Sequence, residues 1–528
     1  MIEDFGADGE GAEFKCDICI VGAGAAGVTL ARELLSSGRQ VLLLESGGEK
    51  YETAVQDMAA GHNIGFPYYD IDHSRLRLFG GTTAIWGGRT AELDAIDFKR
   101  RAWIAHSGWP LHKGDLEPYY RRAHTLLDLP TFSEAAVQGF EKRFDEVVLQ
   151  RSLLLFDEKF DRFALNNCND LKTAPDLTVL LHATVTGFKT NESGSVVKRA
   201  LIANLKGGRG VVTAQQFVLA TGGLEVPRVL LASKSPAHPN GIGNAHDLLG
   251  RFFMEHPRAR GAQIVAHDAS KLLEMMPAAR SYRGRRYSIL LRPSEQLQAR
   301  EGLLNTGFTI NVRKHAGERQ ELGKQIFNAL RHEISPNDLG RGLWKTSRRI
   351  SDYLNNKLGK KIKSRKLAKE GFGLYAVLRA EQAPNPSSRV TLSEEKDALG
   401  LPRLNLDWQF SDIDRESAAG AMRALDHELK RLKFGYVEPA AWLEDKNTSW
   451  EIDPLISKHP IGGYHHMGTA RMAESDKDGV VDADGRVHGV ENLFIAGSAV
   501  FPTVGWANPT LTILALCLRL ADKLKTAD

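Results

Sequence analysis

Three glycines near the N-terminus have the spacing of a nucleotide-binding loop. Gly22, Gly24 and Gly27 form G-x-G-x-x-G in CDICIVGAGAAGVTLAREL, and Glu45 follows eighteen residues after Gly27. In such a loop the first glycine permits a tight turn, the second lets a pyrophosphate reach backbone N–H groups, and the third lets a helix pack on a strand. Glu45 could accept hydrogen bonds from both ribose hydroxyls, and its charge argues against NADP. The sequence therefore predicts a dinucleotide site.

A second glycine-rich stretch, GGTTAIWGG at residues 80–88, has two glycine pairs around a tryptophan. Glycine in place of alanine costs regular structure about 0.5–1 kcal/mol, so this density needs a reason. We expect a flat or charged group to approach the backbone here. A further pair, Gly222 and Gly223, ends the run FVLATGG and is typical of a second strand-to-loop junction.

Histidines and an asparagine that could do acid–base chemistry lie near the C-terminus. His465 and His466 stand in GGYHHMGTARM (462–472), and Asn508 opens NPTLT (508–512). An imidazole titrates near neutral pH and suits removal of a hydroxyl proton. Asn508 also has a favourable N-cap type, with Pro509 expected at the first helical position. The positive end of that helix would favour an anionic group nearby.

These motifs together resemble the glucose-methanol-choline (GMC) oxidoreductases. The resemblance rests on the glycine fingerprint, on GGTTAIWGG, on the H-x-x-G-T of His465–Thr469 and on the N-P-T-L-T of Asn508–Thr512. The segments SGWPLHKGDLEPYYRRA (107–123) and EQAPNPSSRVTL (381–392) are most similar to pyranose oxidase and its bacterial glycoside-oxidising relatives. The family implies FAD and an α/β fold, in which a Rossmann-like FAD-binding domain is joined to a sheet-based α+β substrate-binding domain.

The resemblance also implies how FAD is held. In the family the loop at residues 80–88 lies along the flavin, and several relatives attach FAD covalently through a histidine of this loop. Ile85 stands at that position here, so noncovalent FAD is expected. The implied contacts come from Gly22, Gly24, Ala25, Gly27, Glu45, Ser46, Gly80, Gly81, Thr82, Thr83, Trp86, Gly87, Gly88, Val185, Ala220, Gly222, Gly497, Ser498, Asn508, Pro509 and Thr510.

The same resemblance assigns catalytic roles. His465 is implied as the base and Asn508 as its partner at the same substrate oxygen, above the flavin N5 that accepts a hydride. His466 is the alternative base, and otherwise a packing neighbour. His256, in GRFFMEHPRA, is expected in a packed junction between lobes, with substrate contact as the alternative. The implied substrate is a pyranose or glycoside, oxidised at the C2 or C3 hydroxyl to a ketone.

Apolar runs and breakers predict the elements that position these residues. Strands are expected over 16–21, 41–44 and 493–495 and a helix over 28–36. Alternation predicts strands within 281–293 and 305–313 and a hairpin within 389–410. We expect residues 1–260 and 451–528 to form the FAD-binding domain and residues 261–450 the substrate-binding domain.

Composition bounds the class of protein. The chain has 528 residues, 42% of them hydrophobic and 25% charged, which is an ordinary globular composition. A net charge of +4 does not predict nucleic-acid binding. Four scattered cysteines fit a reducing compartment, and the C-x-x-C of Cys16 and Cys19 has no second ligand pair, so no metal is expected. Neither a secretory signal nor a membrane span is expected, which predicts a cytoplasmic protein.

One segment stands apart in charge. Residues 341–369 hold eleven basic residues and one acid, Asp352, with apolar residues at roughly helical spacing. The pattern predicts amphipathic helices with a cationic outer face. A solvated arm or a contact between copies of a homo-oligomer is favoured over a membrane surface or an acidic partner.

Several functions remain open from the sequence alone. The enzyme could be an oxidase that uses dioxygen, or a dehydrogenase that passes electrons to a quinone or a protein. The same scaffold could act as a lyase that cleaves cyanohydrins while the flavin stays idle. A non-catalytic flavin-binding module would leave the pairing of His465 and Asn508 unexplained.

Overall fold

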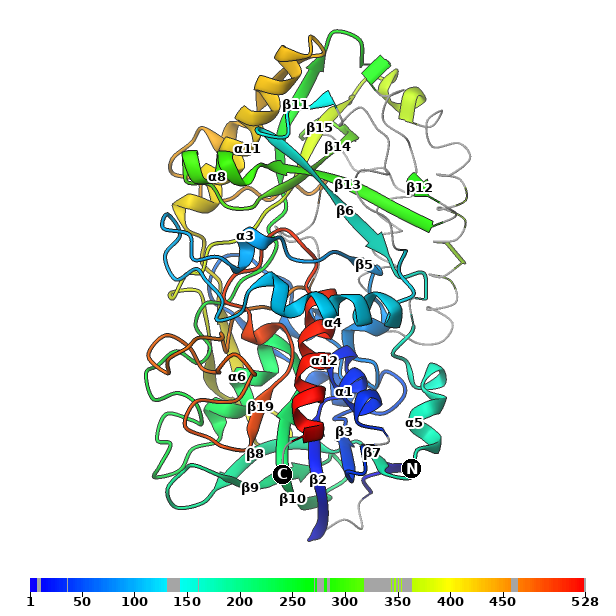
Figure 1. Cartoon of the computed structure of the whole chain (residues 1–528), viewed down its shortest axis with the longest axis vertical. Coiled ribbons are helices and arrows are strands. Elements are labelled where there is room, and N and C mark those ends of the chain that lie inside the picture. Colours follow the sequence, from blue (N-terminus) through cyan, green and yellow to red (C-terminus); the bar gives the residue numbers. More distant parts are fainter. Residues whose placement is uncertain are drawn as a thin grey trace.

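A computed structural model describes most of the chain and has a sheet at each end of its long axis (Figure 1). The residues outside the description are 7–10, 36, 131–142, 160, 270, 273–279, 283–284, 318–342, 344–345, 348–349, 351–352, 354–362, 457–463 and 527–528.

The first sheet is mostly parallel and carries the N-terminus. Its strands run in the order β1-β7-β3-β2-β10-β9-β8, and β19 pairs with β10. The five strands β1, β7, β3, β2 and β10 are parallel neighbours, and β19 is parallel to β10, whereas β9 and β8 are antiparallel additions. The bounds are β1 (Ile2–Asp4), β2 (Ala12–Val21), β3 (Val41–Leu44), β7 (Leu177–Leu181), β8 (Thr184–Thr190), β9 (Val197–Ala203), β10 (Arg209–Leu219) and β19 (Leu493–Ile495).

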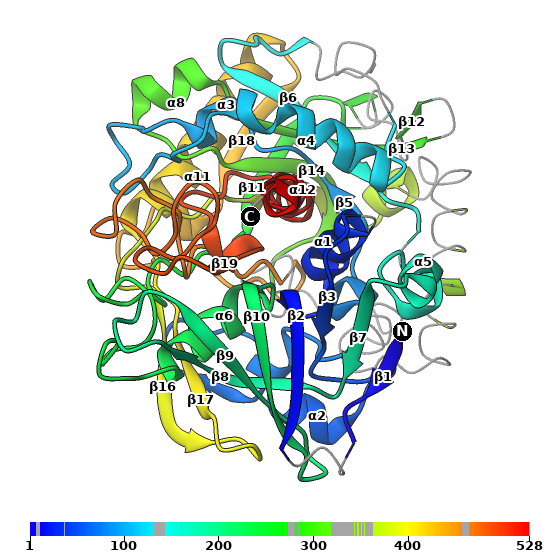
Figure 2. The same ribbon diagram turned by 60° about the horizontal axis from the view of Figure 1, so that its bottom comes forward.

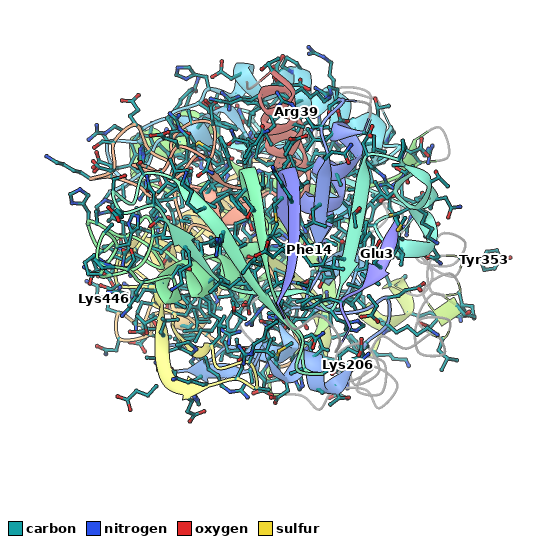
Figure 3. All side chains as sticks on the ribbon, turned by 90° about the horizontal axis from the view of Figure 1, so that it is seen from below. Glu3, Phe14, Arg39, Lys206, Tyr353 and Lys446 are labelled. Carbon is teal, nitrogen blue, oxygen red and sulfur yellow. The ribbon has the colours of Figure 1, made fainter. Side chains whose placement is uncertain are left out.

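Helices cover this sheet because its central strands are apolar on both faces. All four residues of β3 are buried, as is typical of a parallel sheet enclosed between helices. Helix α1 (Ala25–Leu34) and the C-terminal helix α12 (Thr510–Thr526) lie side by side, and α12 also packs on α4 (Lys113–Leu126) (Figure 2). Helix α6 (Gly222–Ala232) packs against β8. From below, the parallel strands lie side by side, with Glu3 labelled on β1 and Phe14 on β2 (Figure 3). This confirms the Rossmann-like part of the predicted fold.

The second sheet is antiparallel and forms the opposite end of the molecule. Its order is β18-β11-β15-β14-β13-β6-β5, and β12 pairs with β13. Helix α11 (Asp412–Arg431) packs on this sheet, and a separate apolar core lies between them. The strands are β5 (Arg89–Thr90), β6 (Leu149–Phe156), β11 (Arg260–Ala266), β12 (Arg280–Tyr282), β13 (Arg285–Pro293), β14 (Gly307–Lys314), β15 (Phe372–Arg379) and β18 (Gly435–Pro439).

A small third sheet joins the hairpin β16 (Arg389–Lys396) and β17 (Pro402–Asp407) to β4 (Gly61–Asn63). The hairpin packs on α6, so it lies beside the first sheet. The second sheet, in turn, takes β5 and β6 from before residue 260. The chain therefore crosses between the two halves several times, and the domain limits 1–260, 261–450 and 451–528 stay a prediction. The shorter helices are α2 (Thr53–Asp57), α3 (Ala95–Phe98), α5 (Asn169–Thr173) and α8 (Glu295–Glu301).

Most predicted elements are found, with shifted ends. Strands β3 and β19 have the predicted bounds, β2 begins at Ala12, and α1 spans Ala25–Leu34 instead of 28–36. The strand predictions within 281–293, 305–313 and 389–410 correspond to β12 to β14, β16 and β17.

The start of α12 corrects one prediction. The N–H of Ile513 donates to the carbonyl of Pro509, and the helix begins at Thr510. Pro509, not Asn508, therefore occupies the cap position. The side chain of Asn508 is engaged instead by Arg379 and His465.

The basic segment and the cysteines add little to the fold. Most of residues 341–369 fall outside the described part, and the prediction made for them lies there too. The four cysteines are free thiols. Within the residues described, no helix combines the length and the apolar character needed to cross a membrane.

Candidate active site

The glycine fingerprint forms the turn between β2 and α1. Gly22 has φ +100°, a conformation that favours glycine. A Cβ on Gly27 would lie 1.9 Å from the carbonyl oxygen of Gly22, so α1 can approach β2 this closely only through glycine. At Gly24 a Cβ would meet no atom within 4 Å, which leaves the backbone open on that side. Ala25 begins α1, where N–H groups lack intrahelical partners and can bind phosphate.

Glu45 follows β3 and turns back to the fingerprint. Its Oε2 accepts from the N–H of Ala23 at 2.9 Å, and its Oε1 accepts from the N–H of Gly47 at 3.0 Å and from the Ser46 hydroxyl at 3.1 Å. A carboxylate has about four lone-pair directions. These three bonds leave part of this capacity free, and the contacts of Glu45 with the ribose hydroxyls stay a prediction.

The loop at residues 80–88 is fastened to the fingerprint. The N–H of Gly80 donates to the carbonyl of Ala23 at 2.8 Å, and a Cβ on Gly81 would lie 3.1 Å from the Cα of Gly24. Gly80, Gly81 and Gly88 have φ of +93°, +53° and +67°. The glycines of this loop thus allow left-handed turns and let the loop backbone lie close to the backbone of the fingerprint. Thr82 and Thr83 form the 3₁₀ turn between them, and Ile85, Trp86 and Gly87 stay partly open.

The other predicted cofactor residues lie after strand ends or in neighbouring strands. The pair Ala220 and Gly222 follows β10, and the pair Gly497 and Ser498 follows β19, which is the next parallel strand. Val185 is buried in β8, two residues after Ala183, whose N–H donates to the carbonyl of Glu45 at 2.8 Å. Pro509 caps α12, and Thr510 is its first residue.

This arrangement fits a dinucleotide. A Cβ at Gly24, Gly87, Gly222 or Gly497 would meet no atom within 4 Å. These open backbones follow β2, β10 and β19 at the same edge of the sheet or belong to the loop fastened there. Ligands of open α/β sheets bind at the carboxyl ends of the strands, so the open glycines lie where FAD would be expected.

His465 and Asn508 meet although 43 residues separate them in the sequence. The Nδ2 of Asn508 lies 3.3 Å from the Nε2 of His465. The Oδ1 of Asn508 accepts a hydrogen bond from Nη1 of Arg379, at the end of β15. A guanidinium only donates, so this bond fixes the amide with its nitrogen toward His465. His465, Asn508 and Arg379 each keep part of their surface open.

His256 determines which nitrogen of His465 carries the hydrogen. The Nε2 of His256 lies 2.9 Å from the carbonyl oxygen of Gly505, which only accepts, so this nitrogen is protonated. Burial lowers the pKa of His256 to about 3, so the ring is neutral and its Nδ1 accepts. The Nδ1 of His465, at 2.8 Å, must then donate to it. The lone pair of a neutral His465 is left on Nε2, beside Asn508.

The electrostatic setting keeps His465 neutral. Burial, with the charge of Arg379 as a further cause, holds the pKa of His465 well below its usual value. A neutral imidazole with an Nε2 lone pair can accept a proton from a hydroxyl placed there.

Glu255 holds both histidine segments in place. Its Oε1 accepts from the N–H of His465 at 2.8 Å and from the Tyr68 hydroxyl at 2.5 Å, and its Oε2 accepts from the N–H of His256 at 3.1 Å. Met254 and Met467 add a pair of backbone hydrogen bonds between the same segments. Burial raises the pKa of Glu255 to about 8. This carboxyl therefore fastens two segments that are far apart in the sequence.

His466 points to a different environment. Its ring packs near Tyr68 and Phe253, and burial lowers its pKa to about 3. Its backbone carbonyl accepts from the Ser498 hydroxyl at 2.7 Å. These contacts match a packing neighbour and lie away from the Nε2 of His465.

Sequence reasoning left out Arg379, Glu255 and the contact of His256 with His465. His256 was expected in a packed junction and is 1% exposed, but its hydrogen bond spans 209 residues. The segment GRFFMEHPRA was the available signal. The sequence holds no comparable signal for Arg379, which ends an ordinary strand.

Two family models match two separate regions of the chain. The model described as FAD dependent oxidoreductase matches residues 17–239, which contain the fingerprint and the loop at 80–88. The model described as GMC oxidoreductase matches residues 384–517, which contain His465 and Asn508.

Individual proteins that are similar to this chain are also oxidases and dehydrogenases by name. The fructose dehydrogenase large subunit of Gluconobacter japonicus is 24% identical over 96% of this chain and 97% of its own. A C-glycoside 3-oxidase of Microbacterium trichothecenolyticum is 35% identical over 30% of this chain and 28% of its own. The solved structure of a fungal aryl-alcohol oxidase, 14% identical, has a TM-score of 0.57 and covers 97% of this chain and 98% of its own, which shows the same fold. The predicted resemblance and the cofactor FAD are confirmed: the chain contains an FAD-dependent oxidoreductase domain and a GMC oxidoreductase C-terminal domain, and it is an FAD-dependent enzyme.

Proposed function

We propose that this enzyme oxidises a secondary hydroxyl of a pyranose sugar or a glycoside, at C2 or C3, to the ketone. The observation that carries the proposal is the contact between Asn508 Nδ2 and the Nε2 of His465, at 3.3 Å. It brings a proton acceptor and a hydrogen-bond donor to one point, where the hydroxyl oxygen of a substrate would bind.

His465 is the base in this proposal. Its Nε2 takes the hydroxyl proton, and Asn508 Nδ2 donates a hydrogen bond to the same oxygen as negative charge develops on it. His256 keeps the hydrogen of His465 on Nδ1, so that Nε2 is free for this step. FAD, when bound, supplies the acceptor for the hydride that leaves the carbon. We propose that it is held noncovalently by the predicted contacts, with Ile85 at the position where some relatives attach it.

The substrate class is supported by the names of relatives. One is a fructose dehydrogenase subunit and another a C-glycoside 3-oxidase, and both names describe oxidation of sugar-like alcohols. The second of these names points to C3 for a glycoside, whereas the resemblance to pyranose oxidase points to C2. Both positions therefore belong in the test.

The test is anaerobic mixing of the FAD-loaded enzyme with monosaccharides and with O- and C-glycosides, followed by the flavin absorbance band. We expect at least one of these compounds to bleach the band and yield a ketone whose position is read by NMR. No bleaching by the sugars and glycosides, with bleaching by simple primary alcohols, would contradict the proposed substrate class. Cleavage of a cyanohydrin without bleaching would identify the lyase.

The electron acceptor is assigned by a second step. Reduced enzyme is exposed either to air or to a quinone, and the recovery of the flavin band is timed. Rapid recovery in air identifies an oxidase, and recovery with the quinone alone identifies a dehydrogenase.

A further inference from the structure

Arg379 is a half-buried arginine next to the proposed base, and within the described part of the chain no carboxylate pairs with it. Among the residues that the structure describes, the hydrogen-bond partner of its side chain is Oδ1 of Asn508. Burial, then the charge of Arg89, lowers the pKa of Arg379 to about 9. A guanidinium has five N–H donors, and the bond to Asn508 uses one of them.

Several buried arginines of this protein are neutralised by carboxylates, although buried Arg471 donates to the backbone carbonyl of His106 instead. Arg101 pairs with Glu381 at 2.5 Å, Arg228 with Asp397 at 2.7 Å and Arg260 with Asp453 at 2.7 Å. An uncompensated buried charge is expensive, and buried charges are normally paired. The neutral amide of Asn508 does not neutralise Arg379, so the site retains a positive charge.

The position of Arg379 in β15 shows on which face of the second sheet its charged side chain lies. Leu374, Ala376 and Leu378 belong to the apolar core with α11. Side chains alternate along a strand, so Arg379 and Tyr375 lie on the opposite face of β15. That face reaches Asn508, at the start of α12, and therefore adjoins the proposed catalytic pair.

We propose that Arg379 binds a carboxylate of the substrate, so that the enzyme acts on a sugar acid or on a glycoside of one. This inference rests on the proposed function and narrows its substrate class. A guanidinium matches a carboxylate through two parallel hydrogen bonds. Asn508 contacts both Arg379 and His465. A carboxylate bound to Arg379 and a hydroxyl bound at His465 would therefore lie close together and belong to one small molecule.

The experiment compares a matched pair of substrates, methyl β-glucuronide and methyl β-glucoside, which differ in the carboxylate. Anaerobic stopped-flow gives the concentration dependence of flavin reduction for each, and thermal unfolding of the oxidised enzyme with each compound gives binding without turnover. Wild-type enzyme is expected to bind and oxidise the glucuronide about tenfold to a hundredfold better than the glucoside, as is typical of a charged hydrogen bond. Arg379→Gln should remove this preference, and Arg379→Lys should keep part of it.

The control is Arg403→Gln, which removes a surface arginine paired with Asp57 and should leave the preference unchanged. Equal use of both compounds by wild-type enzyme would overturn the inference while the proposed function stands. Equal slowing of both by Arg379→Gln would also overturn it, and would assign Arg379 to charge developing during the reaction. If neither compound bleaches the flavin, thermal stabilisation by the glucuronide that is lost in Arg379→Gln supports the carboxylate site, although the proposed oxidation has failed. Absence of that stabilisation overturns the inference.

Discussion

Replacing His256 by leucine tests whether the tautomer of His465 is set by its neighbour. The change removes the nitrogen that accepts from the Nδ1 of His465 at 2.8 Å. His465 would then keep its hydrogen on a nitrogen without a partner, or move it to Nε2, where it blocks proton acceptance. We expect slower flavin reduction in His256→Leu, with FAD still bound.

The magnitude follows from the lost acceptor. A buried donor left without a partner costs about 1–3 kcal/mol, and each 1.36 kcal/mol is a factor of ten in rate. The active tautomer, and with it the rate constant for flavin reduction, should fall roughly fivefold to 150-fold.

The matched control is His256→Gln. Its amide nitrogen can donate to the carbonyl of Gly505 while its amide oxygen accepts from His465, so both hydrogen bonds of His256 are reproduced. Single-turnover flavin reduction is measured for both variants, with FAD content and thermal unfolding as checks of the fold. Wild-type rates in His256→Leu would refute the reasoning. Equal losses in the two variants would reduce His256 to a packing residue.

Three further predictions concern pH, acid stability and cofactor binding. Because the pKa of His465 is held well below its usual value, flavin reduction should stay constant as pH falls to about 6.5 and decline only below it; a decline centred above 6.5 would contradict this. The folded-state pKa of His466 is about 3, so below about pH 6.5 only the unfolded chain binds its proton and the free energy of unfolding falls. In His466→Leu, the free energy of unfolding from urea titrations should fall less steeply with falling pH, by up to about 1.4 kcal/mol per pH unit. An unchanged pH dependence of that free energy would refute the low folded-state pKa of His466. Gly81→Ala places a Cβ at φ +53° and 3.1 Å from Gly24, so FAD retained after gel filtration should fall, whereas Gly114→Ala in α4 should retain it; equal retention would argue against the loop as a cofactor contact.

The parts of the fold set by local pattern were predictable from the sequence. The apolar run ending at Val21, the three glycines and the helix after them lie within some twenty residues, so spacing alone predicts strand, turn and helix. The same holds for β3 and β19, whose bounds were predicted without error. The start of β2 and the ends of α1 moved, and the cap of α12 moved because caps depend on which side chains are engaged elsewhere. Asn508 illustrates this, since its amide bonds to Arg379 and His465.

The candidate site was predictable only in part. His465 and Asn508 stand in the motifs that carry the resemblance, and the fold brings them together. The orientation of His465 depends on His256, and that of Asn508 on Arg379, and these four residues come from four separate segments. Such a hydrogen-bond chain is created when segments far apart in the sequence come together in the fold. It leaves no periodicity or spacing in the sequence from which it could be read.

The measurement that tests the central claim most directly is anaerobic flavin reduction by the FAD-loaded His465→Ala variant, with the best substrate from the sugar and glycoside panel. The account predicts a yellow protein that binds FAD like the wild type and is reduced orders of magnitude more slowly, because the proton acceptor beside Asn508 is gone. Reduction at the wild-type rate would show that another group takes the proton, and the proposed site would have to be abandoned.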